Sequence, residues 1–457
     1  MTKRSHTVLP RNCAQQTTRC SALDMMVAST YPSLFLCYRE RLDTERLQRS
    51  LARVLEDFSA FAGRLRREGS GMVIDHTRGG ALFEVSETGL STAALGEQMR
   101  SAHSSLVCPQ VRARGVLRGK QPLFAARLTH TADGSVLGVL WNHVVGDHAT
   151  MMMLVRAWAS AYREESYEPP IRIEDRNAFL KEHLPPAPNA GKSWEPLSWP
   201  KLVWKFSQVL IATQPARRMV CAFSDEDVDA IHVATRRTQS ITRHDALTAH
   251  LCLVLQRLAP TRISTSFSMA VDLRRRVGIP PNAVGNMSDT VWIRAGASDD
   301  TASVAVRFRG AVRASGSGST LHQDLEALHS LYPKRSLRFG FWSEQFESSR
   351  TNVIVSNVTA MKHFDLIFDA APIAVHARPT DMPASGLVTV MPGPLGQGVI
   401  VEALLPSRVA KRVAGADMRT PLPGLAGPSN PLRDSSRSNC RRRLPEKDSA
   451  RAIATTE

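Results

Sequence analysis

The stretch from residue 122 to residue 162 constrains the fold most, because its apolar pattern changes from that of strands to that of a helix. PLFAARLTH and GSVLGVLW are apolar runs, and the dipeptide Asp133–Gly134 between them is typical of a tight hairpin turn. The following ATMMMLVRAWASAYRE has the length and apolar content of a buried helix. We therefore predict a strand hairpin that leads directly into a helix.

Helices and strands recur on both sides of this stretch. Apolar residues return at helical spacing after Asp43, which predicts a helix to about residue 58. Ser224 with Asp227 resembles a capping box, and Thr242 precedes another helical pattern. Strand patterns lie near residues 269, 355 and 400. Because both kinds of element occur in both halves, the sequence favours α/β or α+β domains.

The chain divides at two changes of composition. Residues 165–200 are rich in proline and are typical of a long connection between two halves. From about Gly415 onward, proline, serine and arginine replace the apolar pattern, which predicts a disordered basic tail. We therefore expect an N-terminal half at 1–175, a linker at 176–215, a C-terminal half at 216–414 and the tail at 415–457.

The chain is basic, with a formal net charge of +16, but the charge is spread thinly. Only 6% of residues are aromatic, and no stretch interleaves aromatic with basic side chains, so we expect no nucleic-acid partner. The seven cysteines contain no CxxC pair, so neither a metal site nor a disulfide framework is expected. With no secretory signal and no apolar run of about 18 residues, we expect no membrane span and a cytoplasmic location.

His143 and Asp147 are the candidate chemical residues. The predicted strand delivers His143 at its end, and Asp147 falls in the turn before the predicted helix. A strand end is a rigid place from which to present a base. The spacing alone is a weak signal, because an ordinary hydrogen-bonded histidine at a strand end explains it better than a catalytic base does.

HVVGDH at 143–148 resembles the HxxxDG motif of the BAHD acyltransferase family. Four other stretches are similar to family segments in the same order: SALD at 21–24, SLARVLEDFSAFAGRLR at 50–66, TRHDALTAHLCLVL at 242–255 and MAVDLRRRVGIPPNAVGN at 269–286. The resemblance covers about residues 20–410. It implies an α/β fold of two chloramphenicol-acetyltransferase-like domains with a channel between them.

The resemblance also implies a reaction. An acyl group, acetyl being the simplest, would move from acyl-coenzyme A to a hydroxyl or amine of a small specialised metabolite, with His143 as the general base. Acyl-coenzyme A would be a co-substrate, no cofactor would be bound permanently, and the protein would be a monomer. A neutral imidazole with an ordinary pKa near 6.5 suits proton removal at neutral pH.

Other roles are implied by the resemblance in the same way. Asp147 would pair with an arginine and hold the loop, with Arg274 favoured over Arg276, although a solvated strand end explains these arginines equally well. Gly285 and Asn286 would form a turn beside the channel.

Three positions depart from the family pattern. His148 replaces the motif glycine, and it would fit poorly if a positive φ were required there. The DFGWG motif is degraded, with Phe368 in register and Asp365 or Asp369 as alternative substitutes for its aspartate. Ser356 and Asn357 stand where the family has Thr/Ser-Ser-Trp. They are expected either to donate to an oxyanion or to form an ordinary strand end, and this change is closer to fungal members and condensation domains than to plant enzymes.

Two alternatives remain open from the sequence. One is a condensation-type transferase that takes its acyl group from a carrier protein, although Asn142 stands where those domains usually have a second histidine. The other is a non-catalytic family member that acts by binding, which the degraded motifs favour and the retained His143 and Asp147 oppose.

Overall fold

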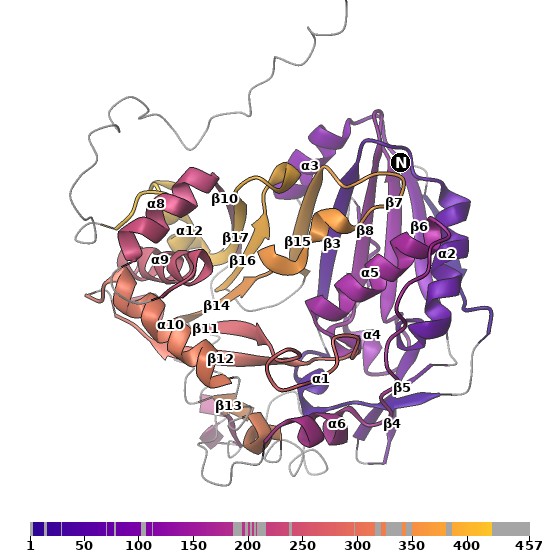
Figure 1. The fold of residues 1–457 in the computed structure, drawn as a ribbon, viewed down its shortest axis with the longest axis horizontal. Helices are drawn as coiled ribbons and strands as arrows, with labels where there is room; N and C mark the ends of the chain where they lie inside the picture. The colour runs from indigo at the N-terminus through magenta and orange to yellow at the C-terminus, as the bar shows by residue number, and fades with distance from the viewer. Residues whose placement is uncertain are drawn as a thin grey trace, which may run out of the picture.

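The computed structural model describes residues 3–12, 16–28, 30–69, 71–76, 79–101, 107–111, 113–185, 194–196, 200–201, 203–204, 207, 216–236, 240–296, 298–315, 321–325, 341–343, 350–380 and 386–422. Two six-stranded sheets dominate this part of the chain, and helices cover each of them (Figure 1). None of the helices in the described ranges is long and apolar enough to span a membrane. The fold is of the α/β class, with two chloramphenicol-acetyltransferase-like halves.

The first sheet holds most of the N-terminal strands, in the order β1-β6-β7-β8-β3-β15. The bounds are β1 Lys3–Val8, β6 Ala81–Glu87, β7 Phe124–His130, β8 Ser135–Trp141, β3 Tyr31–Tyr38 and β15 Ala374–Thr380. Strands β7 and β8 pair antiparallel, as the Asp133–Gly134 turn predicted. Helices α2 (Thr44–Asp57) and α5 (His148–Tyr162) pack together beside this sheet (Figure 1).

The second sheet has the strand order β10-β17-β16-β14-β11-β12. Its bounds are β10 Ala216–Phe223, β17 Val399–Pro406, β16 Leu387–Pro392, β14 Thr351–Asn357, β11 Ile263–Asp272 and β12 Ser288–Arg294. Helices α8 Asp225–Thr235, α9 Arg243–Leu258, α10 Thr301–Ser315 and α12 Ser407–Ala414 accompany it (Figure 1). The strands predicted near residues 269, 355 and 400 are therefore confirmed as β11, β14 and β17.

Shorter elements complete the described chain. Strands β2 Thr17–Arg19, β5 Gly71–Asp75 and β4 Arg64–Glu68 form a three-stranded sheet, and β9 Trp194–Pro196 pairs with β13 Phe341–Ser343. The remaining helices are α1 Ala22–Met26, α3 Thr92–Ser101, α4 Ala113–Val116 and α6 Arg176–His183, and the 3-10 turns are η1 Ser59–Ala62, η3 His143–Val145, η4 Thr359–Met361, η5 His363–Asp365 and η6 Pro394–Gly396.

Local sequence signals account for the helix starts. Asp43 caps α2 by accepting a hydrogen bond from the Arg46 backbone N–H at 2.8 Å. Ser224 opens α8 with a complete capping box, and Thr242 does the same for α9. Each cap provides an acceptor for a backbone N–H that has no partner within its own helix. The three predicted helix starts are confirmed.

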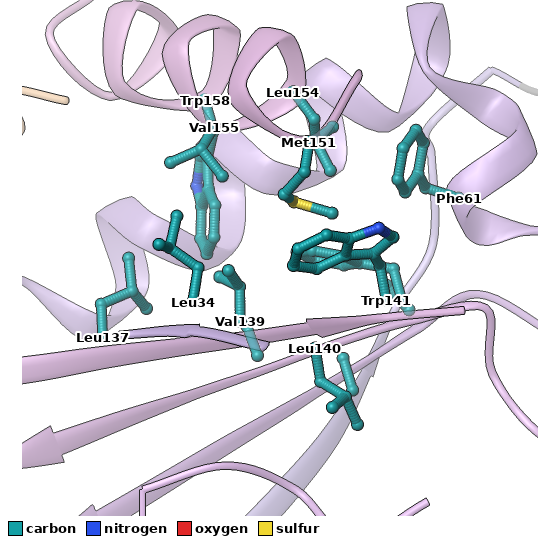
Figure 2. Packing of buried hydrophobic residues seen from close by; sticks show 14 of the residues in the cluster. Leu34, Phe61, Leu137, Val139, Leu140, Trp141, Met151, Leu154, Val155 and Trp158 are labelled. Atoms are coloured by element: carbon teal, nitrogen blue, oxygen red, sulfur yellow. The ribbon is translucent and has the colours of Figure 1, made fainter. Parts of the chain in front are cut away.

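The first core lies between helix α5 and the first sheet (Figure 2). Trp141 from β8 and Trp158 from α5 are both almost fully buried there, among aliphatic side chains such as Leu34, Met151 and Val155. Burying a large apolar side chain stabilises a fold by roughly 1.5–3 kcal/mol. This packing fixes the start of α5 relative to the end of β8, which is where His143 lies.

Strand β15 crosses from the second half of the sequence into the first sheet, where it pairs antiparallel with β3. The segment before it is anchored by Phe368, whose ring meets Trp158 and Tyr162 edge-on. Asp369 accepts a hydrogen bond from the Tyr162 hydroxyl at 2.7 Å. Strand β15 lies within the range expected for the C-terminal half, 216–414, yet it pairs in the first sheet. This pairing, which the sequence did not predict, connects the two halves.

The ranges expected for the linker and for the tail also contain folded residues. Helix α6 lies within the range expected for the linker. Residues 415–422 belong to the expected tail, yet Met418 is buried in the apolar core that the second sheet forms with its helices, and its carbonyl contacts the His250 ring nitrogen at 2.7 Å. The expected tail beyond residue 422 lies outside the described residues.

Candidate functional site

The loop at residues 142–147, here the His143 loop, begins where β8 ends. Asn142 is fully buried, and its side chain donates to the Ala28 carbonyl at 2.8 Å while it accepts from the Val144 backbone N–H at 2.9 Å. The Trp141 ring nitrogen donates to the Gly146 carbonyl at 3.1 Å. These contacts hold η3 rigidly at the strand end, so the position of His143 is determined before any ligand binds.

Asp147 closes the loop and opens α5. Its Oδ1 accepts from the Thr150 backbone N–H at 2.9 Å, which makes Asp147 the N-cap of the helix. Its Oδ2 accepts from the Met287 backbone N–H at 3.0 Å, so the same carboxylate reaches the turn that contains Gly285 and Asn286. The Asp147 backbone N–H donates to the Gly285 carbonyl at 3.3 Å. Asp147 therefore joins two segments that lie about 140 residues apart.

Arg274 forms a two-pronged ion pair with Asp147, at 2.9 Å from Nη1 to Oδ2 and 3.1 Å from Nη2 to Oδ1. Burial alone would raise the pKa of Asp147, but the Arg274 guanidinium and the backbone donors outweigh burial and lower that pKa. The Arg274 side chain also contacts Asp272 at 2.9 Å. Arg276, the second choice from the sequence, donates instead to the Val312 carbonyl.

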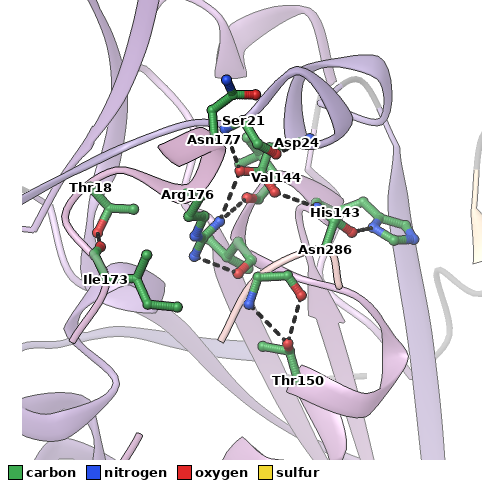
Figure 3. Close-up of polar contacts among 12 residues, drawn as sticks. Thr18, Ser21, Asp24, His143, Val144, Thr150, Ile173, Arg176, Asn177 and Asn286 are labelled. Carbon is green, nitrogen blue, oxygen red and sulfur yellow. Dashed lines mark hydrogen bonds and ion pairs between the residues drawn. The ribbon is translucent and has the colours of Figure 1, made fainter. Parts of the chain in front are cut away.

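Asn286 connects His143 to a buried carboxylate (Figure 3). Its amide nitrogen donates to Asp24 Oδ1 at 2.7 Å and to the His143 carbonyl at 2.8 Å. Its amide oxygen lies 2.9 Å from His143 Nδ1. Because the two donor bonds orient the amide, its oxygen faces His143 and can only accept. His143 Nδ1 therefore carries the proton and Nε2 is left with a lone pair.

Asp24 and Arg176 support the opposite side of the His143 loop. Arg176 is 2% exposed and donates to the carbonyls of Val144 and Val145 at 2.8 and 2.9 Å. It also lies 3.4 Å from Asp24 Oδ2. Asp24 is fully buried at the start of α1, in a capping box with Ser21. The loop is thus held by an arginine on each side, Arg176 through its carbonyls and Arg274 through Asp147.

His143 is partly exposed, and its Nε2 forms no hydrogen bond with any residue that the structure describes. Burial lowers the pKa of His143 below its usual range, although Asp147, Asn286 and Asp24 oppose that shift. The imidazole is therefore neutral at neutral pH. A neutral imidazole with a free, accessible lone pair can remove a proton from an incoming group.

The other predicted site residues lie around this network in different ways. Gly285 belongs to it, since its carbonyl accepts from Arg274 and Thr150 and its φ of 150° favours glycine. Ser356 and Asn357 end β14, and Asn357 accepts from the Thr359 backbone N–H and hydroxyl. In the described part of the chain, no hydrogen bond joins Ser356 or Asn357 to His143.

The sequence did not identify three contributors to the site. Asp24 lay within the SALD segment, but its contact with Asn286 had no local signal. Thr150 donates to Gly285 from the first turn of α5, and Arg176 lay in the range expected for the linker. Within the described ranges, no group of three or more His, Cys, Asp or Glu side chains is arranged to hold a metal ion.

The family motif has glycine at the position of His148, which would fit poorly if a positive φ were required there. His148 does not have a positive φ. It is the first residue of α5, and the non-glycine residues with positive φ in the described chain are Glu164, Lys362 and Leu395. Its Nε2 lies 2.9 Å from Nε2 of His363, a residue of η5 in the segment that leads to β15. The histidine at the glycine position is thus accommodated without backbone strain.

Comparison with known proteins gives matches over most of the chain. The model of the family described as "Transferase family" matches residues 1–411. Rosmarinate synthase from Plectranthus scutellarioides is 27% identical over 37% of this chain and 40% of its own length. Hydroxycinnamoyltransferase 2 from Oryza sativa subsp. japonica is 26% identical over 62% of this chain and 69% of its own length. The matched region is therefore less than half of the first relative and about two thirds of the second.

Solved structures share the fold. TRI101 from F. graminearum, in complex with ethyl coenzyme A, superposes with a TM-score of 0.67 at 16% identity, covering 88% of this chain and 98% of that one. Vinorine synthase superposes with a TM-score of 0.63 at 17% identity, covering 90% and 95%. At these identities the likeness establishes the architecture of two halves and nothing finer.

Proposed function

Because the chain belongs to the Transferase family, the BAHD-type acyltransferases, we propose that it transfers an acyl group from acyl-coenzyme A to a hydroxyl or amine of a small molecule. The observation that carries this proposal is the hydrogen bond between His143 Nδ1 and the Asn286 amide oxygen. That bond leaves Nε2 of a neutral imidazole free at the end of a rigid strand.

The proposed step needs one base and no covalent enzyme intermediate. His143 Nε2 takes the proton from the acceptor hydroxyl or amine as that group attacks the thioester carbonyl. The imidazolium that forms carries a proton on both ring nitrogens, and Nδ1–H keeps its bond to Asn286. When the tetrahedral intermediate collapses, His143 returns the proton to the departing coenzyme A thiolate, and the carbonyl carbon is now bonded to the acceptor.

Asp24 assists this step at a distance. The transient positive charge on His143 is stabilised by the Asn286 amide dipole, which the buried Asp24 carboxylate polarises through a 2.7 Å hydrogen bond. Asp147 adds a favourable charge effect, since it raises the pKa of His143 against the effect of burial. Its main role in this proposal is to hold the loop through Arg274, because its carboxylate oxygens are already occupied by donors.

The proposal also names the acyl donor, acyl-coenzyme A, and the place of the reaction. Support comes from TRI101, whose structure holds ethyl coenzyme A within the shared fold. We place the reaction in a channel between the two halves, with acetyl as the first donor to test and a specialised metabolite as acceptor. Ser356 and Asn357 are the proposed donors to the oxyanion. We also propose that the protein acts as a monomer, since one chain supplies every residue of the His143 network, and that it is located in the cytoplasm.

The test compares the full chain with His143→Ala and with the matched control His6→Gln, which alters an exposed histidine on β1. Thiol release is followed from acetyl-, malonyl- and benzoyl-coenzyme A with pooled alcohols and amines. We expect acceptor-dependent release by wild type and His6→Gln, and a loss of 100-fold or more, roughly the contribution of a general base, in His143→Ala. Equal release by all three proteins would refute the role of His143. No release by wild type, with no binding of coenzyme A, would refute the function itself.

A further inference from the structure

His148 and His363 form a pair that the proposed reaction does not use. They come from α5 and η5, which lie 215 residues apart, and their Nε2 atoms are 2.9 Å apart. The ring centroids are 5.2 Å apart with a tilt of 59° between the planes. Either Nε2 can be a donor or an acceptor, so the contact is a hydrogen bond only if one of the two atoms carries a proton and the other a lone pair.

Both rings are neutral at physiological pH. Burial lowers the pKa of His148 to about 4, while Asp147 opposes that shift and the neighbouring His143 adds to it. Burial and then His148 itself lower the pKa of His363 to about 3. A neutral imidazole has one N–H and one lone pair, so the pair contains one donor and one acceptor at the shared contact.

The surroundings of His363 decide which ring donates. His363 is fully buried, and its Nδ1 has no hydrogen-bond partner among the described residues. A buried N–H without a partner is less favourable than a buried lone pair without one. His363 therefore carries its proton on Nε2 and donates it to His148 Nε2. It follows that His148 carries its own proton on Nδ1.

His148 Nδ1–H points away from His363, because the two nitrogens of an imidazole face different directions. The His148 side chain remains partly exposed although it lies deep enough for burial to dominate its pKa. Its Nδ1 makes no hydrogen bond with the part of the chain that the structure describes. Trp141 packs edge-on against the ring with centroids 5.9 Å apart, which limits rotation of the side chain. His148 thus has an oriented, unused donor, and it lies near enough to His143 for the two rings to interact electrostatically.

We propose that His148 determines acceptor specificity by donating its Nδ1–H to an oxygen of the acceptor next to the group that is acylated. This inference rests on the proposed acyl transfer. The acceptor class is a neutral molecule with a hydroxyl, carbonyl or ether oxygen adjacent to the reacting hydroxyl or amine. A neutral acceptor is favoured because the buried pair carries no charge that would attract an ion.

The expected discrimination is modest and measurable. One neutral hydrogen bond in a partly exposed site is worth a preference of about tenfold in kcat/KM over an analogue that lacks the oxygen. We expect this preference to appear mainly in KM, because the bond is made in the ground state as well as in the transition state. A donor to the oxyanion would instead lower kcat for every acceptor when removed.

The experiment measures kcat and KM for pairs of acceptors, such as a vicinal diol and its monodeoxy analogue, with one acyl donor. Wild type and His6→Gln should prefer the diol by about tenfold, and His148→Ala should lose that preference. His363→Gln retains an amide N–H at the position of Nε2 and should keep the preference. His363→Met has no donor, so the proton of His148 is no longer restricted to Nδ1, and the preference for the diol should weaken.

A spectroscopic measurement tests the tautomer separately. Nitrogen-15 NMR of histidine-labelled protein distinguishes the two ring nitrogens, and the His148 signal is assigned by its loss in His148→Ala. A proton on His148 Nε2 in wild type would overturn the inference. So would an unchanged preference in His148→Ala, or a loss of kcat that is equal for both acceptors. Absence of transfer by wild type with every donor and acceptor would instead refute the proposed function, and the inference with it.

Discussion

Replacing Asp147 by asparagine isolates the charge of the carboxylate while keeping its shape. The carboxylate accepts four hydrogen bonds, from the Thr150 N–H, the Met287 N–H and two nitrogens of Arg274. Asparagine can keep the two bonds to one oxygen, including the helix cap, because asparagine is a good N-cap residue. Its NH2 group then replaces Oδ2 and faces the Met287 N–H and Arg274 Nη1, which are both donors. Because the NH2 group cannot accept, these two hydrogen bonds are lost.

The expected cost follows from those two bonds. The lost bond to the guanidinium is worth roughly 1.5–3 kcal/mol and the bond to the backbone about 1 kcal/mol. The Met287 N–H is left buried without a partner, whereas Arg274 Nη1 keeps its hydrogen bond to Asp272 Oδ1 at 2.9 Å. The two bonds sum to about 2.5–4 kcal/mol, which overlaps the usual cost of about 3–5 kcal/mol for breaking a buried ion pair. Because Arg274 keeps its contact with Asp272, we expect the lower end of this range.

The matched control is Asp272→Asn, which removes the other carboxylate that Arg274 contacts. The Asp272 side chain is 41% exposed, so this pair is screened by water and should contribute less than about 1 kcal/mol. Urea unfolding followed by tryptophan fluorescence gives the free energy of unfolding of each variant. If Asp147→Asn and Asp272→Asn were equally stable, the buried ion pair would not be what holds the His143 loop.

The same substitution has a pH signature. Since the pKa of Asp147 is lowered in the folded protein, its stabilisation is present above the ordinary value of 3.8 and is lost as the pH falls through the lowered value. The difference in stability between wild type and Asp147→Asn should therefore be constant near neutral pH and shrink in acid. A difference that grew on acidification would contradict the ion-pair explanation.

Three further predictions concern the same network. Since the pKa of His143 is lowered, kcat/KM should rise with pH through a midpoint below 6.5 and be flat at neutral pH, and a midpoint above 6.5 in a pH–rate profile would contradict a neutral base. Arg176→Met should destabilise the fold by about 3–5 kcal/mol in urea unfolding, because two loop carbonyls and Asp24 lose a buried partner. Lys at this position should recover little of the loss, because it cannot reproduce the two-pronged contact. Gly285→Ala should cost about 1–3 kcal/mol, because a Cβ would lie 2.9 Å from the Met287 methyl and the φ of 150° is unfavourable for alanine, and a thermal midpoint equal to wild type would refute that strain.

Local sequence patterns were sufficient for many individual elements. The starts of α2, α8 and α9 follow from Asp43, Ser224 and Thr242, because a capping side chain acts on a backbone N–H only two or three residues away. The β7–β8 hairpin follows from a two-residue turn between apolar runs. These interactions act within a few residues, so they are readable before the chain is folded.

The site was only partly accessible from the sequence. The motif resemblance drew attention to His143, Asp147, Arg274 and Asn286, and the structure brings all four together. The resemblance did not reveal that Asn286 orients its amide through Asp24, a contact between residues 262 positions apart. Nor did it distinguish Ser356 and Asn357 from an ordinary strand end.

What the sequence determined by itself was therefore many of the individual elements and, through the motif resemblance, the candidate residues His143 and Asp147. Only the tertiary structure decided that β15 crosses into the first sheet, that Arg176 clamps the His143 loop, and that His148 meets His363. The physical reason is range. Caps and turns depend on the nearest few residues, whereas the proton position on an imidazole and the charge of a buried carboxylate depend on partners that only folding brings within hydrogen-bond distance.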